Sequence, residues 1–444
     1  MFILVVLTYN HMVLQILFLI IAAAAIALFS WNVRKIIRNI NLGRPVDRSD
    51  RPSERLAIML KVAFGQSKMA KRPVAFVLHL FVYIGFIIIN LEVLEIIIDG
   101  LFGTHRIFAE PLGGLYNVLI ASFEVLAAFV LIGVIVFFAR RNIVHLKRFS
   151  GTEMGKWPRS DANIILIVEV LLMSAFLTMN AADYKLQQLG ALHYISAGSF
   201  PISSFLVPLL PDSETALIAI ERACWWLHII GIFVFLNYLP YSKHLHIILA
   251  FPNTYYSNLE PMGEFSNMSS FINEVKSMLD PGYTPEPVPE GGRFGAKDIG
   301  DLSWKSLMDA YTCTECGRCT SVCPANITGK LLSPRKIIMD TRDRMEEVGK
   351  NIDKHGQDHQ DGKSLLDSYI SREEIWACTT CNACTDACPV NIDPLSIIVE
   401  LRRYAVMEES QAPASINAMF GNVENNGAPW KYAAVDRMNW AEEN

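Results

Sequence analysis

The sequence predicts a mainly α-helical protein in two parts: a bundle of five membrane-spanning helices, and after it a helical, cysteine-rich domain. Two observations carry this prediction. The long apolar runs are confined to the first 250 of the 444 residues, and eight of the nine cysteines lie between residues 313 and 388. The chain is 52% hydrophobic and 19% charged, which is apolar for a soluble protein. Its net charge of −5 offers nothing to attract nucleic acid.

Five apolar segments have the length of a membrane-spanning helix, which needs roughly 20 residues to cross a hydrocarbon core of about 30 Å. They run approximately over residues 12–31, 74–98, 116–139, 162–180 and 222–249. The first segment differs from a signal peptide, because its positive charges follow the apolar run instead of preceding it. We therefore expect a retained first span with its N-terminus outside the cell.

The distribution of Lys and Arg predicts how these spans are oriented. The connections 32–72 and 140–161 contain eleven and six of these residues, whereas the connections 99–115 and 181–221 contain one each. Positive charge gathers on the cytoplasmic side of membrane proteins. We therefore expect a protein of the cell (inner) membrane whose cysteine-rich domain lies in the cytoplasm, where exposed thiolates survive.

The cysteine-rich part contains one pattern twice, C-x2-C-x2-C-x3-C-P, at residues 313–324 and 378–389. This is the run that binds [4Fe–4S] clusters in bacterial ferredoxins, where the fourth cysteine of each run ligates the other cluster. The expected ligand sets are Cys313, Cys316, Cys319 and Cys388 for one cluster, and Cys378, Cys381, Cys384 and Cys323 for the other. A zinc site would leave the middle cysteine of each triplet unexplained, and disulfide frameworks belong to small secreted domains.

Composition predicts the boundaries of the soluble part. A membrane domain over residues 1–256 is followed by a Pro- and Gly-rich linker at 257–302. The two-cluster domain is expected at 303–405, and a tail without clear periodicity at 406–444. Within the cluster domain, helices are expected over residues 333–348, 365–375 and 394–407.

Histidines within the spans indicate a second cofactor, because ionisable groups in a bilayer are costly and usually functional. His79 follows Pro73 by six residues, which puts it about 9 Å into the membrane. His246 is expected near the same cytoplasmic edge, and two such imidazoles on facing helices could hold a haem b. Haem c is not expected, since the chain contains no C-x-x-C-H run. The competing interpretation makes His79 a packing residue and His246 an interfacial one.

A second haem nearer the outer surface is a further hypothesis. His228 and His246 are 18 residues apart and would share one face of a continuous fifth helix. The position in the second span that should pair with His228 is occupied by Ile89 and Asn90, neither a usual iron ligand. His228 could instead lie at a quinone pocket. Four carboxylates within or near spans could relay protons to a quinone, or could simply reach water: Glu92, Glu95, Glu124 and Glu169.

These features resemble known proteins. Five spans with two histidines 18 residues apart in the fifth resemble the cytochrome b subunit of respiratory nitrate reductases and its relatives in membrane heterodisulfide reductases. The stretch Pro-Tyr-Ser-Lys-His-Leu-His at 240–246 falls at that family's proximal haem ligand, which His246 matches. His228 matches a distal ligand. The family's second histidine in span two is missing here.

The soluble part is similar to the small iron–sulfur subunit of heterodisulfide reductases. Its first cysteine run and residues 329–335 and 376–381 also resemble membrane-bound electron-transfer flavoprotein:menaquinone oxidoreductases. That resemblance implies two [4Fe–4S] clusters, haem b and menaquinone as the substrate. Those proteins continue into cysteine-rich CCG modules that this chain lacks, so a CCG-type partner subunit is expected.

The sequence therefore predicts the membrane subunit of a quinone-linked oxidoreductase. Electrons would pass from a cytoplasmic donor, such as electron-transfer flavoprotein, through the clusters and haem b to menaquinone in the lipid. Two alternatives stay open. One is the reverse reaction, a quinol-oxidising module that feeds a cytoplasmic reductase, and the other is a non-catalytic membrane anchor.

Overall fold

The computed structural model describes residues 2–285, 293–431 and 433–442. These residues form helices and loops with no β-strand among them, which confirms the mainly α-helical class. The chain divides into two compact units. Unit 1 comprises Met1–Arg38, Ala57–Pro252 and Thr314–Cys316, and unit 2 comprises Asn39–Leu56, Asn253–Cys313 and Gly317–Asn444.

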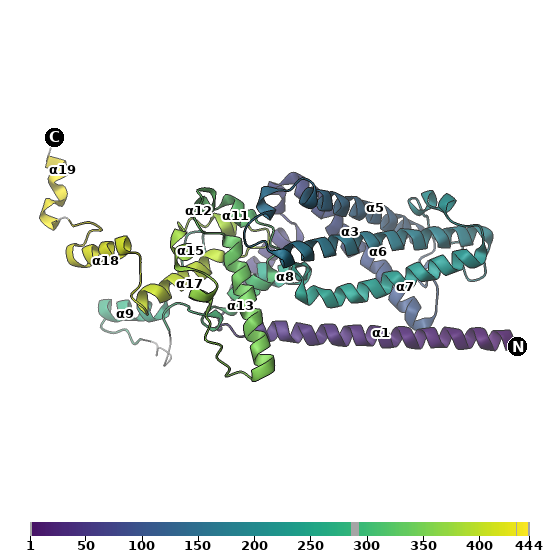
Figure 1. Cartoon of the computed structure of the whole chain (residues 1–444), viewed down its shortest axis with the longest axis horizontal. Coiled ribbons are helices and arrows are strands. Elements are labelled where there is room, and N and C mark those ends of the chain that lie inside the picture. Colours follow the sequence, from purple (N-terminus) through teal and green to yellow (C-terminus); the bar gives the residue numbers. More distant parts are fainter. Residues whose placement is uncertain (1, 286–292, 432, 443–444) are drawn as a thin grey trace. The chain divides into compact units, whose positions relative to one another are not determined.

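Among its described residues, unit 1 contains five long helices that are apolar enough to cross a membrane, as expected (Figure 1). They are α1 (Phe2–Ile40), α3 (Pro73–Phe102), α5 (Gly114–Asn142), α6 (Lys156–Leu189) and α7 (Glu214–Tyr238). Helix α3 packs against α5, α5 against α6, and α6 against α7. Fully buried residues such as Ile120 and Ile229 form the core between them.

The ends of these helices follow from residues with special backbone properties. Pro73 occupies the first turn of α3, where a missing N–H leaves no hydrogen bond broken. Gly103 and Gly190 end α3 and α6 in the left-handed conformation, with φ of 69° and 71°. Ser213 caps α7 by accepting a hydrogen bond from the N–H of Ala216.

The fifth span differs from its prediction. Helix α7 ends at Tyr238, and two short 3₁₀ turns, Leu239–Tyr241 and Lys243–Leu245, lead into a separate helix, α8 (His246–Tyr255). Pro240 explains the break, because a proline cannot donate the hydrogen bond that a continuing helix needs there. The expectation that His228 and His246 share a face of one helix is therefore wrong.

Unit 2 is built from short helices around α13. They are α9 (Ser269–Leu279), α10 (Trp304–Thr312), α11 (Arg318–Val322), α12 (Pro324–Ile327), α13 (Pro334–His355), α14 (Leu365–Ser368), α15 (Arg372–Ala377), α16 (Ala383–Ala387), α17 (Pro394–Met407), α18 (Ala414–Asn426) and α19 (Asn439–Glu442). Helices α10 and α17 pack against α13. Leu307, Ile337 and Leu401 from these three helices are fully buried.

Several boundaries in unit 2 differ from those expected. The helix over 394–407 is confirmed as α17, whereas the single helix over 365–375 is wrong. The backbone is non-helical at Leu366 and at Asp367, whose φ is 74°, and α14 ends at Ser368 before α15 begins at Arg372. Helix α13 is longer than expected. The expected linker contains α9, and the expected tail contains α18. The part of that linker at 286–292 lies outside the described residues.

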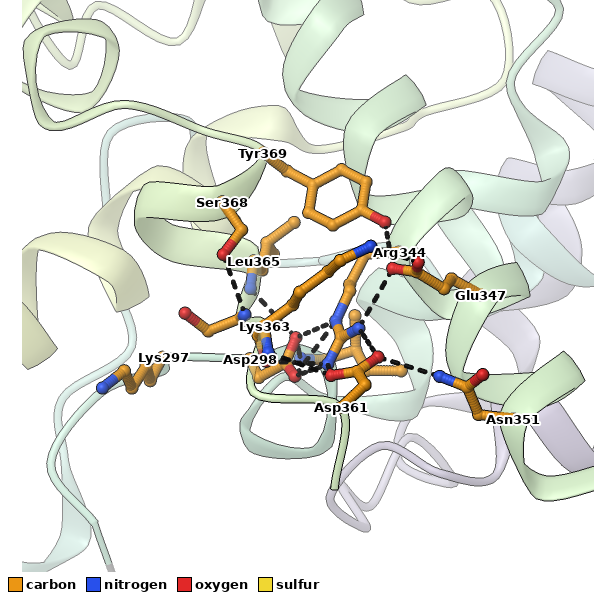
Figure 2. Close-up of polar contacts among 12 residues, drawn as sticks. Lys297, Asp298, Arg344, Glu347, Asn351, Asp361, Lys363, Leu365, Ser368 and Tyr369 are labelled. Atoms are coloured by element: carbon orange, nitrogen blue, oxygen red, sulfur yellow. Dashed lines mark hydrogen bonds and ion pairs between the residues drawn. The ribbon is translucent and has the colours of Figure 1, made fainter. Parts of the chain in front are cut away.

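The insertion between the two cysteine runs is fastened to α13 by Arg344 (Figure 2). Its guanidinium donates to both carboxylate oxygens of Asp298 and to both of Asp361, at 2.6–3.2 Å. Asn351, about two helical turns further along α13, also donates to Asp361. Arg344 is 4% exposed, so this bidentate network fixes the loop that separates the two runs.

Candidate functional site

The two cysteine runs adopt the same backbone conformation. The third residue of each run, Glu315 or Thr380, has a φ of 54°. The fifth residue, Gly317 or Asn382, also lies in the left-handed region. Each run then enters a five-residue helix, α11 or α16, that ends at its fourth cysteine. Two equivalent loops of this kind are what a repeated cluster-binding motif requires.

Helices α11 and α16 pack against each other. They carry Cys319 and Cys384, the third cysteines of the two runs. Burial, and to a smaller extent Cys323 at the end of the first run, raise the pKa of the Cys378 thiol in the second run. The exchange of the fourth ligand between the runs stays a prediction.

Burial raises the pKa of two thiols, Cys378 and Cys384, in the second set, which comprises Cys378, Cys381, Cys384 and Cys323. The pKa of Cys378 is raised first by burial and then by neighbouring Cys323 and Cys381, although a hydrogen bond from Thr380 opposes the shift. Burial and the carboxylate of Asp393 raise the pKa of Cys384 to about 12. Thiols that resist ionisation become thiolates when a metal cation compensates the charge, which iron would do here.

Backbone amides point at two of these sulfurs. The N–H of Thr380 donates to Sγ of Cys378 at 3.4 Å, and the N–H of Ile392 donates to Sγ of Cys388 at 3.3 Å. Hydrogen bonds to cluster sulfurs are one of the means by which a protein sets the reduction potential. Among the residues that the structure describes, no three His, Cys, Asp or Glu side chains converge on a single ion. A cubane instead distributes its four thiolates over four different irons.

A cationic side chain lies beside the second set. Arg402, on α17, donates from Nε to the carbonyl of Ile375 at 2.9 Å and from Nη2 to the carbonyl of Cys378 at 2.5 Å. Its guanidinium also stacks on the ring of Trp376, 5.0 Å from the centroid. Sequence reasoning missed Arg402, because nothing in the cysteine pattern points to a residue on the last helix of the domain.

In unit 1, the histidine pair expected from the sequence is brought together. The ring centroids of His79 and His246 are 6.4 Å apart and the rings are inclined by 46°. His79 Nδ1 is 3.0 Å from Oε1 of Gln66, and His246 Nδ1 is 3.0 Å from the carbonyl of Lys243. Metal-binding histidines typically use one ring nitrogen for such a hydrogen bond and the other for the metal.

The distance between the two ring centroids can be compared with the distance expected when two imidazoles bind one metal ion. An imidazole nitrogen lies about 2 Å from a bound transition metal, so two imidazoles on opposite sides of one ion have centroids roughly 6 Å apart. The observed 6.4 Å between His79 and His246 agrees with this value. His79 and His246 are therefore the residues that would hold a haem iron, which would supply a one-electron carrier at this place.

Asp161, on α6, holds the turn that presents His246. One carboxylate oxygen accepts hydrogen bonds from the hydroxyls of Tyr238 and Ser242, both at 2.6 Å. The other accepts the N–H of Lys243 at 3.1 Å. The carbonyl of the same Lys243 is the hydrogen-bond partner of His246 Nδ1. The buried carboxylate of Asp161 therefore positions the imidazole through Lys243. Both Asp161 and Gln66 were missed from the sequence, since neither belongs to a motif.

His228 lies elsewhere in the bundle. It is 1% exposed, its Nδ1 is 3.0 Å from the carbonyl of Leu172 on α6, and its ring packs against Phe176 at 5.8 Å. Among the ring contacts of the described residues, none brings a second histidine to it. His228 therefore packs against α6. Among the described residues, no second histidine ring lies beside it to serve as the other ligand of a haem.

Known proteins were compared with this chain. Residues 312–392 match the family model of the 4Fe–4S dicluster domain. A probable iron–sulfur-binding oxidoreductase FadF of Bacillus subtilis is 30% identical over 96% of this chain and 61% of its own length. An EtfAB:quinone oxidoreductase of Syntrophomonas wolfei is 28% identical over 90% of this chain and 55% of its own length.

One subunit of a ferredoxin/F420H2-dependent CoB–CoM heterodisulfide reductase, from Methanosarcina acetivorans, is 34% identical over 24% of this chain and 52% of its own length. No solved structure matches the chain. The chain spans somewhat more than half the length of the curated relatives that it matches along most of its sequence. The chain is therefore a homologue of iron–sulfur oxidoreductases of this kind, and it contains a 4Fe–4S dicluster domain.

Proposed function

We propose that this protein transfers electrons between two [4Fe–4S] clusters and menaquinone in the cell membrane, through one haem b held by His79 and His246. The observation that carries the proposal is the arrangement of these two imidazoles, 6.4 Å apart and each oriented by a hydrogen bond at Nδ1. Haem supplies a one-electron carrier that an apolar bundle can hold. Asp161 and Gln66 keep the two ligands oriented.

The proposed cluster ligands are those expected from the sequence. One cluster would use Cys313, Cys316, Cys319 and Cys388, and the other would use Cys378, Cys381, Cys384 and Cys323. The matching left-handed residues in the two runs and the packing of α11 on α16 support the pairing. His228 is kept as a candidate contact for a quinone or a second haem, and its burial is the supporting observation.

The electron donor is proposed to be a soluble flavoprotein of the electron-transfer flavoprotein class, acting directly or through a CCG-type iron–sulfur subunit. The name of the Syntrophomonas relative supports a quinone as the acceptor. The positive charges in the connections 32–72 and 140–161 support a cytoplasmic location for the cluster domain and an outside N-terminus.

The reverse reaction is a second candidate. The similarity to one subunit of a heterodisulfide reductase favours a module that oxidises menaquinol and delivers electrons to a cytoplasmic reductase. Both directions use the same groups. They differ in the reduction potentials of the clusters relative to that of the quinone, because electrons flow to the carrier of higher potential.

The test is a quinone-linked electron-transfer assay on the purified full-length chain in lipid nanodiscs, with the haem and cluster spectra recorded on the same sample. Reduced clusters should pass electrons to a short-chain menaquinone analogue. His79→Ala should remove the haem absorbance and at least nine-tenths of the rate, while the electron paramagnetic resonance of the clusters stays. His145→Ala, which changes an exposed histidine outside the pair, is the matched control. Unchanged rates in His79→Ala would contradict the proposal.

A further inference from the structure

The end of the bundle far from His79 encloses a network of charged residues around Arg106, which is 6% exposed. Its Nε pairs with Oδ2 of Asp183 at 2.6 Å, and its Nη2 donates to Oδ1 of Asn180 at 2.9 Å. Its Nη1 donates to the hydroxyl of Tyr116 at 3.1 Å. The network therefore joins the loop after α3 to α5 and α6.

Carboxylates outnumber cations in this region. Six buried carboxylates surround or adjoin it: Glu92, Glu95, Asp99, Glu124, Asp183 and Glu221. Among the described residues, the basic groups bonded into it are Arg106, His105 beside Asp183 at 3.5 Å, and the partly exposed Arg222 on Glu221. An uncompensated carboxylate is very costly to bury. An excess of buried carboxyl groups over cations therefore favours a network that holds protons as well as charges.

Glu92 differs from the other carboxylates. It is 2% exposed, and its Oε2 is buried without a hydrogen-bond partner. Its Oε1 lies 3.7 Å from Nη1 of Arg106, which is too far for a good hydrogen bond. By contrast, Glu95 accepts from the hydroxyl of Tyr116 at 2.8 Å and from the N–H of Phe108 at 2.9 Å. Glu92 thus has an open position that a proton donor or acceptor could fill.

Glu124 also contrasts with Glu92, because its carboxylate is saturated. Oε2 accepts the backbone N–H groups of Ile202 and Ser203 at 2.9 and 3.1 Å. Oε1 accepts from Nδ2 of Asn180 at 3.3 Å. Glu124 therefore has no open position for a further hydrogen bond from the protein, unlike Glu92.

A chain of polar side chains leads from the network to the surface. Arg222, whose side chain is 41% exposed, pairs with Glu221. The hydroxyl of Tyr194 donates to Glu221 at 3.1 Å, and its ring meets that of His105 at 5.1 Å. Nδ1 of His105 is buried without a partner, while its Nε2 faces Asp183. From Glu221 inward, the side chains of Tyr194, His105 and Asp183 therefore lie in sequence, with a ring contact between Tyr194 and His105.

We propose that this network is a proton route that starts at the surface near Arg222 and ends at Glu92, where it exchanges protons with quinone. The inference rests on the proposed function. Reduction of a quinone to quinol consumes two electrons and two protons, and the reverse reaction releases both. The clusters and haem would carry the electrons one at a time, and Glu92 would carry the protons one at a time. Glu92 lies 13 residues, or about 20 Å of helix, beyond His79 on α3.

A purely structural network would hold the helix ends together and exchange no proton. The two roles are separated by Glu92→Gln, which keeps the shape and removes the exchangeable proton, and by Glu92→Asp, which restores a carboxyl group. Glu110→Gln is the matched control, because Glu110 lies at the same end of the bundle, on α4 (Ala109–Leu112), and is exposed.

The experiment uses full-length protein in proteoliposomes with a menaquinol analogue as the reductant, ferricyanide as the electron acceptor and a pH dye to follow protons. Glu92→Gln should slow both ferricyanide reduction and proton appearance at least tenfold, with unchanged haem and cluster spectra. Glu92→Asp should recover a substantial part of both, and Glu110→Gln should match the wild type. Equal rates and proton yields in Glu92→Gln and wild type would overturn the proton route.

A second readout is independent of quinone. The infrared difference spectrum between dithionite-reduced and oxidised protein should contain a protonated-carboxyl band that disappears in Glu92→Gln and shifts in Glu92→Asp. A band unaffected by either substitution would also overturn the route. If the wild type itself fails to oxidise the quinol while this band is present, the quinone reaction of the proposed function fails and proton exchange at Glu92 stands.

Discussion

The dicluster part and the membrane bundle prepare their sites in opposite ways. Each cysteine run places three ligands within seven residues and repeats the same left-handed positions, at 315 and 317 in one run and at 380 and 382 in the other. The bundle instead pairs His79 with His246, which are 167 positions apart and lie on α3 and α8. A local motif encodes the first site, whereas helix packing assembles the second. Damage to the first should therefore stay local, and damage to the second should spread through its supports.

The largest effect is expected when one ligand of a local site is removed. Cys384→Ser should abolish the cluster of the second set and leave the other cluster present, because each set has four ligands of its own. Iron content should fall by half, and electron paramagnetic resonance should report one cluster type. Loss of both signals would show that the two runs fold as one inseparable site. Cys224→Ser, in α7, should change neither signal.

Asp161 supports the site formed by His79 and His246, and we expect its loss to matter almost as much as the loss of either histidine. Asp161→Ala removes the acceptor of three hydrogen bonds that hold the turn before His246. We expect haem occupancy to fall to a minor fraction, on the 10–100-fold scale typical of lost supporting contacts. Asp161→Asn, which keeps one acceptor oxygen, should retain more haem. Full occupancy in Asp161→Ala would mean that the turn is fixed without it.

The insertion between the cysteine runs offers a test of local stability. Arg344→Ala leaves Asp298 and Asp361 without their shared partner, and should destabilise unit 2 by about 2–3 kcal/mol, less than for a fully buried pair because Asp298 is partly exposed. Lys350→Ala on the same helix breaks an exposed pair with Glu346 and should cost about 0.5 kcal/mol or less. Chemical unfolding followed by circular dichroism measures both. Equal losses of unfolding free energy in the two variants would show that Arg344 does not hold the loop.

The same contact predicts a pH dependence. Hydrogen bonds from Arg344 lower the pKa of Asp361 from 3.8 to about 2. A lowered pKa stabilises the folded state fully above the unfolded value, and that stabilisation is lost as the pH falls from about 4 through about 2. Asp361→Asn should therefore be less stable than the wild type at neutral pH, and the difference should shrink in acid. A difference that stays constant from pH 5 to pH 2 would assign the effect to something other than this ionisation.

The smallest effect is expected at the cation beside the second cysteine set. Arg402→Gln removes a positively charged side chain that donates a hydrogen bond to the carbonyl of Cys378. Reduction adds an electron, so loss of a nearby cation should lower the reduction potential of that cluster. Redox titration followed by electron paramagnetic resonance measures the shift. The reduction potential of Arg402→Lys should lie between those of the wild type and Arg402→Gln. A potential that rises in Arg402→Gln would contradict this assignment.

The contrast also explains what could be predicted from the sequence. The five spans and both cysteine runs were predictable, because hydropathy and spacing are local signals. His79 and His246 were found through depth along the helices, although Pro240 ends α7 and makes the assumed common face of His228 and His246 wrong. Arg106 appeared in the sequence only as a lone positive charge. Its contacts with Asp183 and Asn180 depend on the packing of α6 against the loop after α3, which no local pattern encodes.

The most direct test of the central claim is the reduced-minus-oxidised optical spectrum of the purified full-length protein, compared with those of His79→Ala and His246→Ala. The account predicts a b-type haem with two imidazole ligands in the wild type and its loss in both variants, with cluster signals retained. A wild type that binds no haem, or variants that keep it unchanged, would contradict the claim that α3 and α8 together bind the iron.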